Sequence, residues 1–386
     1  MSAITINAYR RSADSVGIRN HIVVMSSVSC ANSFVERIAL ADDDVIPITH
    51  QHGCAHHAED TEQILRTLSG TCSNPNVGGV LLVGLGCETT GAEDIAARIP
   101  AHNRIVKTLV IQQVGKISRI MELAVESLRQ MKDFVKRQRH EECDIAALKV
   151  GLKCGGSDPF SGITANPAVG LVSDRLVRLG ATTILAEIPE MIGAEAPLAP
   201  RIPDEAVRRK LLSRIAEYAQ MARHVGGEGR VNLSPGNIRA GLSSPAEKSL
   251  GCIAKGGHSE IREFVAYAEV PKSKGLVVMD TPGYDCESVS GMVAGGANLV
   301  LFTTGLGTPL GNPVAPVIKI SSNTRTYRKM REFTDIDAGR IIRGAKMEEV
   351  ADEIFDFLVE VCNGRQTASE INRCREFAIN RIGPTF

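Results

Sequence analysis

The stretch Gly151-Leu-Lys-Cys-Gly-Gly-Ser-Asp-Pro-Phe-Ser-Gly-Ile-Thr-Ala-Asn-Pro-Ala-Val-Gly170 decides the fold of this 386-residue chain. An apolar run of strand length, residues 145–150, precedes it, and apolar residues three or four apart follow it from Ala168 to Leu179. A strand that ends in a polar, glycine-rich turn before a helix is typical of an open α/β sheet. Ligands bind at the carboxyl ends of the strands in such sheets.

The turn itself is rich in groups that can bind or react. Its polar side chains are Cys154, Ser157, Asp158, Ser161, Thr164 and Asn166. A glycine-rich turn with an Asp or Ser cap can be purely structural, but such a turn does not need this many polar side chains. We therefore predict that Ser157, Asp158 and Asn166 contact a substrate or a metal.

Strands and helices alternate along the rest of the chain. We expect strands at 20–27, 45–49, 80–84, 104–112, 145–150, 182–187, 274–279, 297–302 and 317–321, mostly with helical patterns between them. This pattern predicts an α/β fold of two Rossmann-like units, with mostly parallel sheets flanked by helices. The first unit covers residues 1–144 and ends in a long linking helix near 116–139. The second covers 145–386 and carries the opening stretch.

Composition excludes several classes of protein. Lys+Arg and Asp+Glu both number 44, so the net charge is zero and nothing indicates a nucleic-acid or membrane partner. No apolar run reaches the roughly 18 residues of a membrane helix, and we find no signal peptide. The ten cysteines form no CxxC pair, which is typical of free thiols in a cytoplasmic protein. An iron–sulfur protein would need distant cysteines, such as Cys54, Cys87 and Cys154, to converge.

Two strand ends of the first unit carry potential metal ligands. Four histidines and a cysteine lie within residues 50–57, where His50, His52 and Cys54 alternate and could converge on one ion. The alternative is a polar loop with surface histidines. Cys87 and Glu88 follow the strand at 80–84 in the same way.

The second unit supplies carboxylates, a lysine and hydroxyls. Glu187 and Asp280 follow strands and are candidate metal ligands or bases, while Glu247 and Lys248 form a candidate acid/base pair. The alternative for that pair is a capping Glu beside a surface Lys. Arg19 and Lys153 are candidate anchors for a carboxylate or sulfonate. The remaining candidates are Cys154 as a metal ligand and Thr303 and Thr304 as substrate contacts.

These groups favour one kind of chemistry over others. Oxygen-rich ligand sets suit Mg²⁺, Mn²⁺ or Fe²⁺, and such an ion can stabilise the enolate formed when an α-proton leaves. A lone Gly305-Leu-Gly307 gives little support for NAD binding. The residues therefore favour metal-assisted proton abstraction followed by β-elimination.

Five stretches in the same order resemble the altronate and galactarate dehydratase family. They begin at Asn74, Gly151, Ser234, Met279 and Gly295 and read NPNVGGVLLVGLGCE, GLKCGGSD…SGITANPA, SPGN…EKSLG, MDTPGY and GGAN…FTTGLG. The resemblance runs from about Tyr9 to the C-terminus. It implies a lyase that converts a 2-hydroxy carboxylate with a β leaving group into a 2-keto acid, usually with Fe²⁺ or another divalent metal.

Two features depart from the single-chain members of that family. Such enzymes carry a small N-terminal domain of the antifreeze-like (SAF) type, which is missing here, and residues 9–20 keep only the Val-Gly-x-Arg-Asn end of the usual opening motif. The resemblance thus implies a separate small SAF-type subunit, a small anionic 2-hydroxy acid substrate and a homo-oligomer of the heteromer. A two-subunit member that eliminates bisulfite from (2R)-3-sulfolactate is favoured. A hydro-lyase acting on a sugar acid and a non-catalytic carboxylate- or metal-binding subunit are the alternatives.

Overall fold

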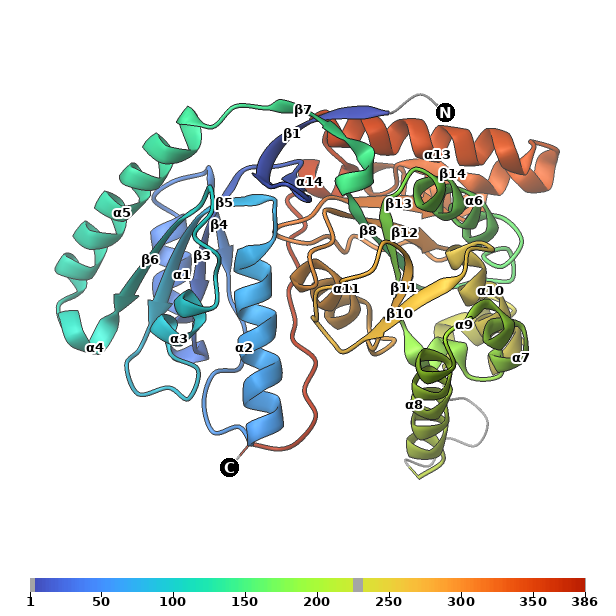
Figure 1. The fold of residues 1–386 in the computed structure, drawn as a ribbon, viewed down its shortest axis with the longest axis horizontal. Helices are drawn as coiled ribbons and strands as arrows, with labels where there is room; N and C mark the ends of the chain where they lie inside the picture. Colours follow the sequence, from blue (N-terminus) through green and yellow to red (C-terminus); the bar gives the residue numbers. More distant parts are fainter. Residues whose placement is uncertain (1–3, 225–231, 386) are drawn as a thin grey trace.

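A computed structural model describes residues 4–224 and 232–385 and shows two α/β units (Figure 1). Each unit contains a parallel sheet flanked by helices, so the predicted fold class is confirmed. Among the described residues, no helix is both long and apolar enough to span a bilayer. All ten cysteines lie in these ranges, and none forms a disulfide.

The first unit is built on a four-stranded parallel sheet in the order β4-β3-β5-β6. Its central strand β5 is buried at every position, as expected of a parallel strand covered on both faces. The elements of this unit are β3 (His21–Ser26), α1 (Asn32–Ala39), β4 (Val45–Ile48), α2 (Ala58–Ser73), β5 (Val77–Gly84), α3 (Ala92–Ala97), β6 (Ile105–Val110), α4 (Ile111–Val114) and α5 (Ile117–Arg137).

The second unit is built on a seven-stranded parallel sheet in the order β10-β11-β9-β8-β12-β13-β14. The chain starts in the middle, at β8, and proceeds to one side before it returns to the other side at β12. Its elements are β8 (Lys149–Cys154), α6 (Ala165–Arg178), β9 (Thr182–Leu185), α7 (Glu195–Leu198), α8 (Glu205–His224), α9 (Pro235–Arg239), α10 (Pro245–Ile253), β10 (Ile261–Val265), β11 (Gly275–Met279), α11 (Asp285–Ala294), β12 (Leu299–Thr304), β13 (Val317–Ser321), α12 (Thr324–Lys329), β14 (Ile336–Asp337), α13 (Met347–Cys362) and α14 (Ala368–Ile371).

A small antiparallel sheet, which the sequence did not predict, joins the two units. It consists of β2 (Ser15–Gly17), β1 (Thr5–Ser12) and β7 (Glu141–Asp144), in that order. The strand expected at 145–150 also begins later, because residues 145–147 form a 3₁₀ turn in which the Asp144 carboxylate accepts the N–H group of Ala146. Strand β8 therefore extends to Cys154 and brings the glycine-rich turn directly to its end.

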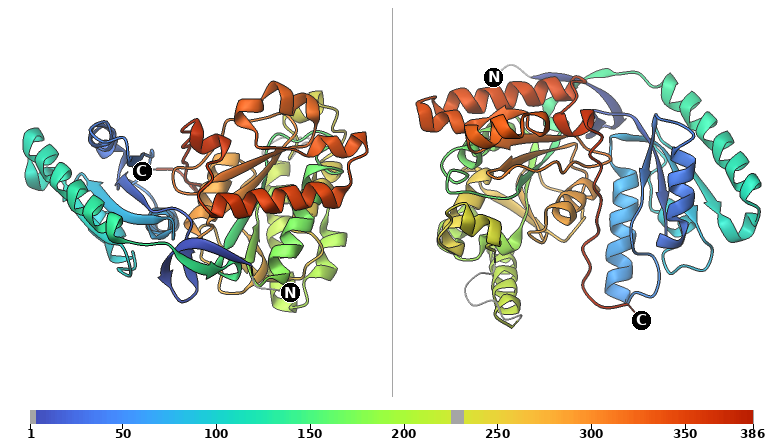
Figure 2. Two further views of the ribbon diagram at one scale, coloured as in Figure 1. Left: turned by 90° about the horizontal axis from the view of Figure 1, so that it is seen from above. Right: turned by 180° about the vertical axis from the view of Figure 1, so that it is seen from behind.

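The interface between the units is apolar and is crossed by the C-terminal segment. Helices α2 and α11 pack together across it, and one buried apolar cluster contains residues from both sheets. The C-terminal segment leaves α14 and runs beside α2 to the far end of the first unit (Figures 1 and 2). There Thr385 pairs with His56, and the buried Asp60 carboxylate accepts the N–H groups of Ile382 and Gly383 at 2.7 and 2.9 Å.

Candidate active site

The candidate site lies at the carboxyl edge of the seven-stranded sheet, beside the point where the strand order reverses between β8 and β12. Ligands bind at this position in doubly wound sheets. The turn after β8 passes very close to β12, because a Cβ on Gly155 would come within 2.5 Å of the Phe302 ring. Glycine is therefore needed at position 155 to let the turn reach the sheet edge.

Glu187 is at the centre of the buried charges. Its backbone has φ 73° and ψ 61°, a left-handed conformation that non-glycine residues adopt mainly at special sites. One carboxylate oxygen contacts the Lys153 ammonium, and the other accepts from Lys255 at 2.6 Å and from the Cys154 N–H at 3.0 Å. Burial alone would raise the pKa of Glu187, but the two ammonium groups lower it to about 2. Glu187 is thus a fixed anion.

The partners of Glu187 come from β8 and from the 3₁₀ turn Ala254–Gly256 that follows α10. Lys153 also forms an ion pair with Asp285 at 2.9 Å, and Lys255 lies 3.0 Å from the Cys252 sulfur. We did not predict Lys255 or Cys252. The spacing of Lys248, Cys252 and Lys255, four and then three residues apart, is a signal that could have found them, since it places them on one helical face.

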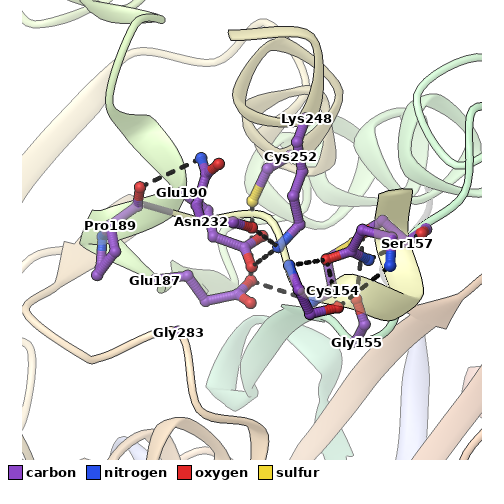
Figure 3. Close-up of polar contacts among 12 residues, drawn as sticks. Cys154, Gly155, Ser157, Glu187, Pro189, Glu190, Asn232, Lys248, Cys252 and Gly283 are labelled. Atoms are coloured by element: carbon purple, nitrogen blue, oxygen red, sulfur yellow. Dashed lines mark hydrogen bonds and ion pairs between the residues drawn. The ribbon is translucent and has the colours of Figure 1, made fainter. Parts of the chain in front are cut away.

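A second buried pair lies beside the first. The Lys248 ammonium contacts one oxygen of Glu190 and donates to the Asn232 carbonyl at 2.8 Å (Figure 3). The other oxygen of Glu190 is buried and has no hydrogen-bond partner among the described residues. Burial and the neighbouring Glu187 anion raise the pKa of Glu190 above its usual value. Glu190 can therefore gain and lose a proton closer to neutral pH than an exposed carboxylate can.

A cavity of about 300 Å³ opens next to Lys248. Ser157, Asn166 and Lys248 provide polar groups on its wall, and its apolar part includes Ile163, Leu242 and Leu250. The Asn166 amide is held in place, because its oxygen accepts from Thr303 at 2.5 Å and its NH₂ donates to the Gly251 carbonyl at 2.9 Å. The structure thus brings Ser157, Asn166 and Lys248 to one cavity, with Thr303 directly behind it.

Asp158 lies in the same wall, but its hydrogen bonds hold the loop. One oxygen accepts from Ser161 and from the Ser322 hydroxyl at 2.6 Å, and the other accepts from Asn323 at 2.7 Å. Glu247 lines the cavity rim without contacting Lys248 and accepts from the Ser243 N–H and hydroxyl at the start of α10. Those bonds lower the pKa of Glu247.

Three other candidates, Asp280, Arg19 and Thr304, make contacts away from this cavity. Asp280 forms an ion pair with Arg214 at 2.7 Å, in a separate pocket beside α8. Two guanidinium nitrogens of Arg19 donate to the Glu370 carboxylate, and Arg19 also donates to three backbone carbonyls. Arg19 therefore connects the segment before β3 to the C-terminal region. The Thr304 hydroxyl accepts from Gly307 N–H and shapes the turn after β12.

The candidate ligands of the first unit form a separate group. His50 uses both ring nitrogens, one with the Ser26 carbonyl at 2.8 Å and the other with the His52 N–H at 3.2 Å. Burial lowers the pKa of His50 to about 4, so its ring is neutral at pH 7. Glu88 accepts from Ser27 and from two backbone N–H groups, while the Cys54 and Cys87 residues are exposed. Within the part of the chain that the structure describes, no hydrogen bond joins these residues to Glu187.

Glu187, Glu190 and Cys252 have ligand atoms within 4.8 Å of one another, as in a metal site. They do not fit a divalent metal as they stand, because each of them already contacts a lysine ammonium group. Cys154, another predicted ligand, has its sulfur 3.0 Å from the Ser157 hydroxyl and is not part of this trio.

Comparison with known proteins identifies the family. The profile of the D-galactarate/altronate dehydratase C-terminal domain matches residues 145–385, and that of the second domain of D-galactarate dehydratase/altronate hydrolase matches residues 8–136. The chain therefore belongs to the D-galactarate/altronate dehydratase family, as the five sequence stretches predicted. It is thus a member of a family of lyases.

Individual relatives differ in how much of their length the match covers. The chain is 35% identical to altronate dehydratase of Bacillus subtilis, over 99% of this chain and 78% of the relative. It is 35% identical to galactarate dehydratase (L-threo-forming) of Escherichia coli, over 95% of this chain and 74% of the relative. It is 33% identical to (2R)-sulfolactate sulfo-lyase subunit beta of Chromohalobacter salexigens, over 98% of this chain and 97% of the relative.

Proposed function

We propose that this chain is the catalytic large subunit of a lyase that removes a β-group from a 2-hydroxy carboxylate and yields a 2-keto acid. The observation that carries this proposal is the buried Glu190–Lys248 pair beside the cavity, because it combines a carboxylate of raised pKa with an ammonium group. A base of that kind suits removal of a weakly acidic α-proton, and a nearby cation stabilises the resulting negative charge.

Glu190, which contacts Lys248, and the residues of the cavity wall have distinct roles in this proposal. Glu190 takes the α-proton, the electron pair forms the C2–C3 double bond, and the β-group leaves C3 with its bonding electrons. The enol then gains a proton at C3 and becomes the keto acid. Lys248 faces the developing enolate, and the Asn166 amide and Ser157 hydroxyl orient the substrate's carboxylate and hydroxyl.

We favour (2R)-3-sulfolactate as the substrate, with pyruvate and bisulfite as products. The match to the sulfo-lyase subunit covers 97% of that relative, whereas it covers 78% of the Bacillus altronate dehydratase. The alternative is a sugar-acid hydro-lyase that releases water, and the 35% identity to the dehydratases supports it. Hydroxide is a much poorer leaving group than sulfite, so the alternative needs a general acid at C3.

A partner chain is part of the proposal. The sulfo-lyase relative is named as a subunit, and the apolar side chains of Ile163 and Leu250, which line the cavity, are exposed in this chain. We propose that a small SAF-type chain covers this rim and that the resulting heteromer associates further with copies of itself.

A divalent metal also belongs to the proposal. Fe²⁺ is favoured, and Mn²⁺ and Mg²⁺ are the alternatives. Its ligands would be groups other than Glu187, Glu190 and Cys252.

A keto-acid assay tests the function. The chain is co-expressed with a small SAF-type chain of the same genome, supplied with Fe²⁺ or Mn²⁺, and given 3-sulfolactate and a panel of hexonates and hexarates. Pyruvate with an equal amount of sulfite supports the sulfo-lyase. A deoxy keto acid without sulfite supports the hydro-lyase. Absence of turnover with every substrate would contradict both of these substrate assignments and would mean either a different 2-hydroxy acid or the non-catalytic alternative.

A further inference from the structure

The trio Glu187, Glu190 and Cys252 has the donor types and the spacing of a metal site, but a lysine lies among its donors. The Lys255 ammonium is 2.6 Å from a Glu187 oxygen and 3.0 Å from the Cys252 sulfur. The remaining oxygen of Glu187 contacts Lys153, and Lys248 contacts Glu190. The Lys255 ammonium thus takes the place that a cation would need to reach both Glu187 and Cys252.

The backbone that carries Lys255 is held firmly. Lys255 is fully buried, and the following Gly257 has φ +60°, with its Cα so close to α6 that a Cβ would lie 2.4 Å from the Gly170 carbonyl. The Asp174 carboxylate accepts the next two N–H groups, of His258 and Ser259, at 2.9–3.0 Å. Both contacts are with α6, so they hold the turn that carries Lys255 against that helix.

The charge balance also disfavours an added metal. Lys153, Lys248 and Lys255 are buried beside Glu187 and Glu190, and a divalent cation would add two positive charges next to three ammonium groups. Charges shielded from water interact strongly, so such a cation would be repelled. Burial alone would lower the pKa of Lys255, but Cys252 and Glu187 raise it well above its usual value, which keeps the ammonium charged.

We propose that the Lys255 ammonium is the built-in cation of this cluster, so that Glu187, Glu190 and Cys252 bind no divalent metal in the folded protein. Lys255 acts as a positioning residue: it holds Glu187, which in turn fixes the Cys154 N–H at the start of the glycine-rich turn. This inference concerns the cluster alone and stands whichever substrate the protein takes.

Cobalt binding tests the inference without any assay of activity. Co²⁺ is added to the purified full-length wild type, to K255M, to C252S and to the double variant K255M/C252S. A sulfur ligand produces an intense near-ultraviolet charge-transfer band, and equilibrium dialysis counts the bound ions. K272M, at an exposed lysine, is the matched control.

We expect the wild type and C252S to give the same cobalt spectrum, because Cys252 binds no metal. K255M should gain a charge-transfer band and one more bound ion, and both should disappear in K255M/C252S. A band in the wild type that C252S removes would overturn the inference. It would also be overturned if folded K255M gained no ion. Should K255M fail to fold, the comparison of wild type with C252S still decides whether Cys252 binds metal.

Discussion

At the scale of single residues, Glu190 contacts Lys248 of the cavity wall with one carboxylate oxygen, and its other oxygen is buried without a hydrogen-bond partner among the described residues. Replacing Glu190 by Gln should lower kcat by roughly 10²–10⁴-fold, the usual contribution of a general base. Because Glu190 must be deprotonated to act and its pKa is raised, wild-type kcat should fall as the pH decreases through that raised pKa.

The E190Q variant should lack this acid limb in its residual activity. Glu260→Gln, at an exposed carboxylate that pairs with Arg262, is the control and should keep the wild-type pH profile. Steady-state kinetics between pH 4 and 9 check both statements. Wild-type kcat in E190Q would show that another group takes the proton.

The negative charge of Glu187 stabilises the folded protein. Replacing it by Gln leaves Lys153 and Lys255 without their shared anion, and breaking a buried ion pair in this way costs about 3–5 kcal/mol in unfolding free energy. The folded-state pKa is lowered from 4.5 to about 2, so the stabilisation is complete above the unfolded pKa and is lost as the pH falls toward 2.

The difference in stability between wild type and E187Q should therefore be large at pH 7 and shrink below about pH 4.5. Urea unfolding at several pH values measures it. Glu360→Gln, at an exposed carboxylate, is expected to change the unfolding free energy by less than about 1 kcal/mol. A difference for E187Q that does not depend on pH would mean that Glu187 stabilises the fold by its shape alone.

At the scale of elements, the site depends on how closely α6 approaches the turn that carries Lys255. A Cβ at Gly170 would lie 2.3 Å from the Ala254 carbonyl, so Gly170→Ala must push the two elements apart. We expect a loss of about 1–3 kcal/mol in stability, as for other overpacked sites.

The same change should increase amide exchange around Lys255, which hydrogen–deuterium exchange can measure. Gly236→Ala is the control, because its added Cβ meets neighbours only at an ordinary 3.4 Å. Equal melting temperatures for wild type and G170A would show that the contact between α6 and the turn is less tight than the structure indicates.

The elements also show what the sequence could and could not predict. Apolar runs predicted most of the parallel strands within a few residues, because a buried strand has a strong local pattern, but they did not predict the edge strands β10 and β14. Strands β1 and β7 have weak patterns and are rich in charge, and their pairing of Thr5 with Asp144 spans most of the first unit. No local signal reports such a pairing.

The residues of the candidate site, like the strands, were predicted only in part. Ser157, Asn166 and Lys248 could be predicted because they belong to dense motifs at strand ends or a helix start. Asp280 follows a strand in the same way, yet it points to Arg214, and only the three-dimensional direction of the side chain reveals this. The sequence did not indicate Lys255 as a site residue, because a lysine before two glycines is typical of an ordinary turn.

At the scale of the whole molecule, Asp60 connects the first unit to the last residues of the chain. Its buried carboxylate accepts from Ile382 and Gly383 and pairs with His57 at 2.9 Å. Asp60→Ala should lower stability by about 1–3 kcal/mol per group left unsatisfied and should release the C-terminal segment from α2.

Hydrogen–deuterium exchange of residues 376–385 and thermal melting check this expectation. Asp43→Ala removes an exposed carboxylate 3.5 Å from Arg373 and should alter neither measurement. Unchanged protection of the segment in D60A would show that packing against α2 alone holds it in place.

The positions of β1 and of the C-terminal segment have a consequence for synthesis on the ribosome. Strand β1 leaves the exit tunnel before the parallel sheet of the first unit, but its partner β7 follows more than a hundred residues later. Chains grow at about 5–20 residues per second, so β1 waits several seconds without its partner. The cap on Asp60 arrives only with residues 382 and 383. A nascent chain that stalls after the first unit therefore carries an open strand edge, which can pair with another chain, and its Asp60 carboxylate lacks the two N–H groups that cap it in the complete fold.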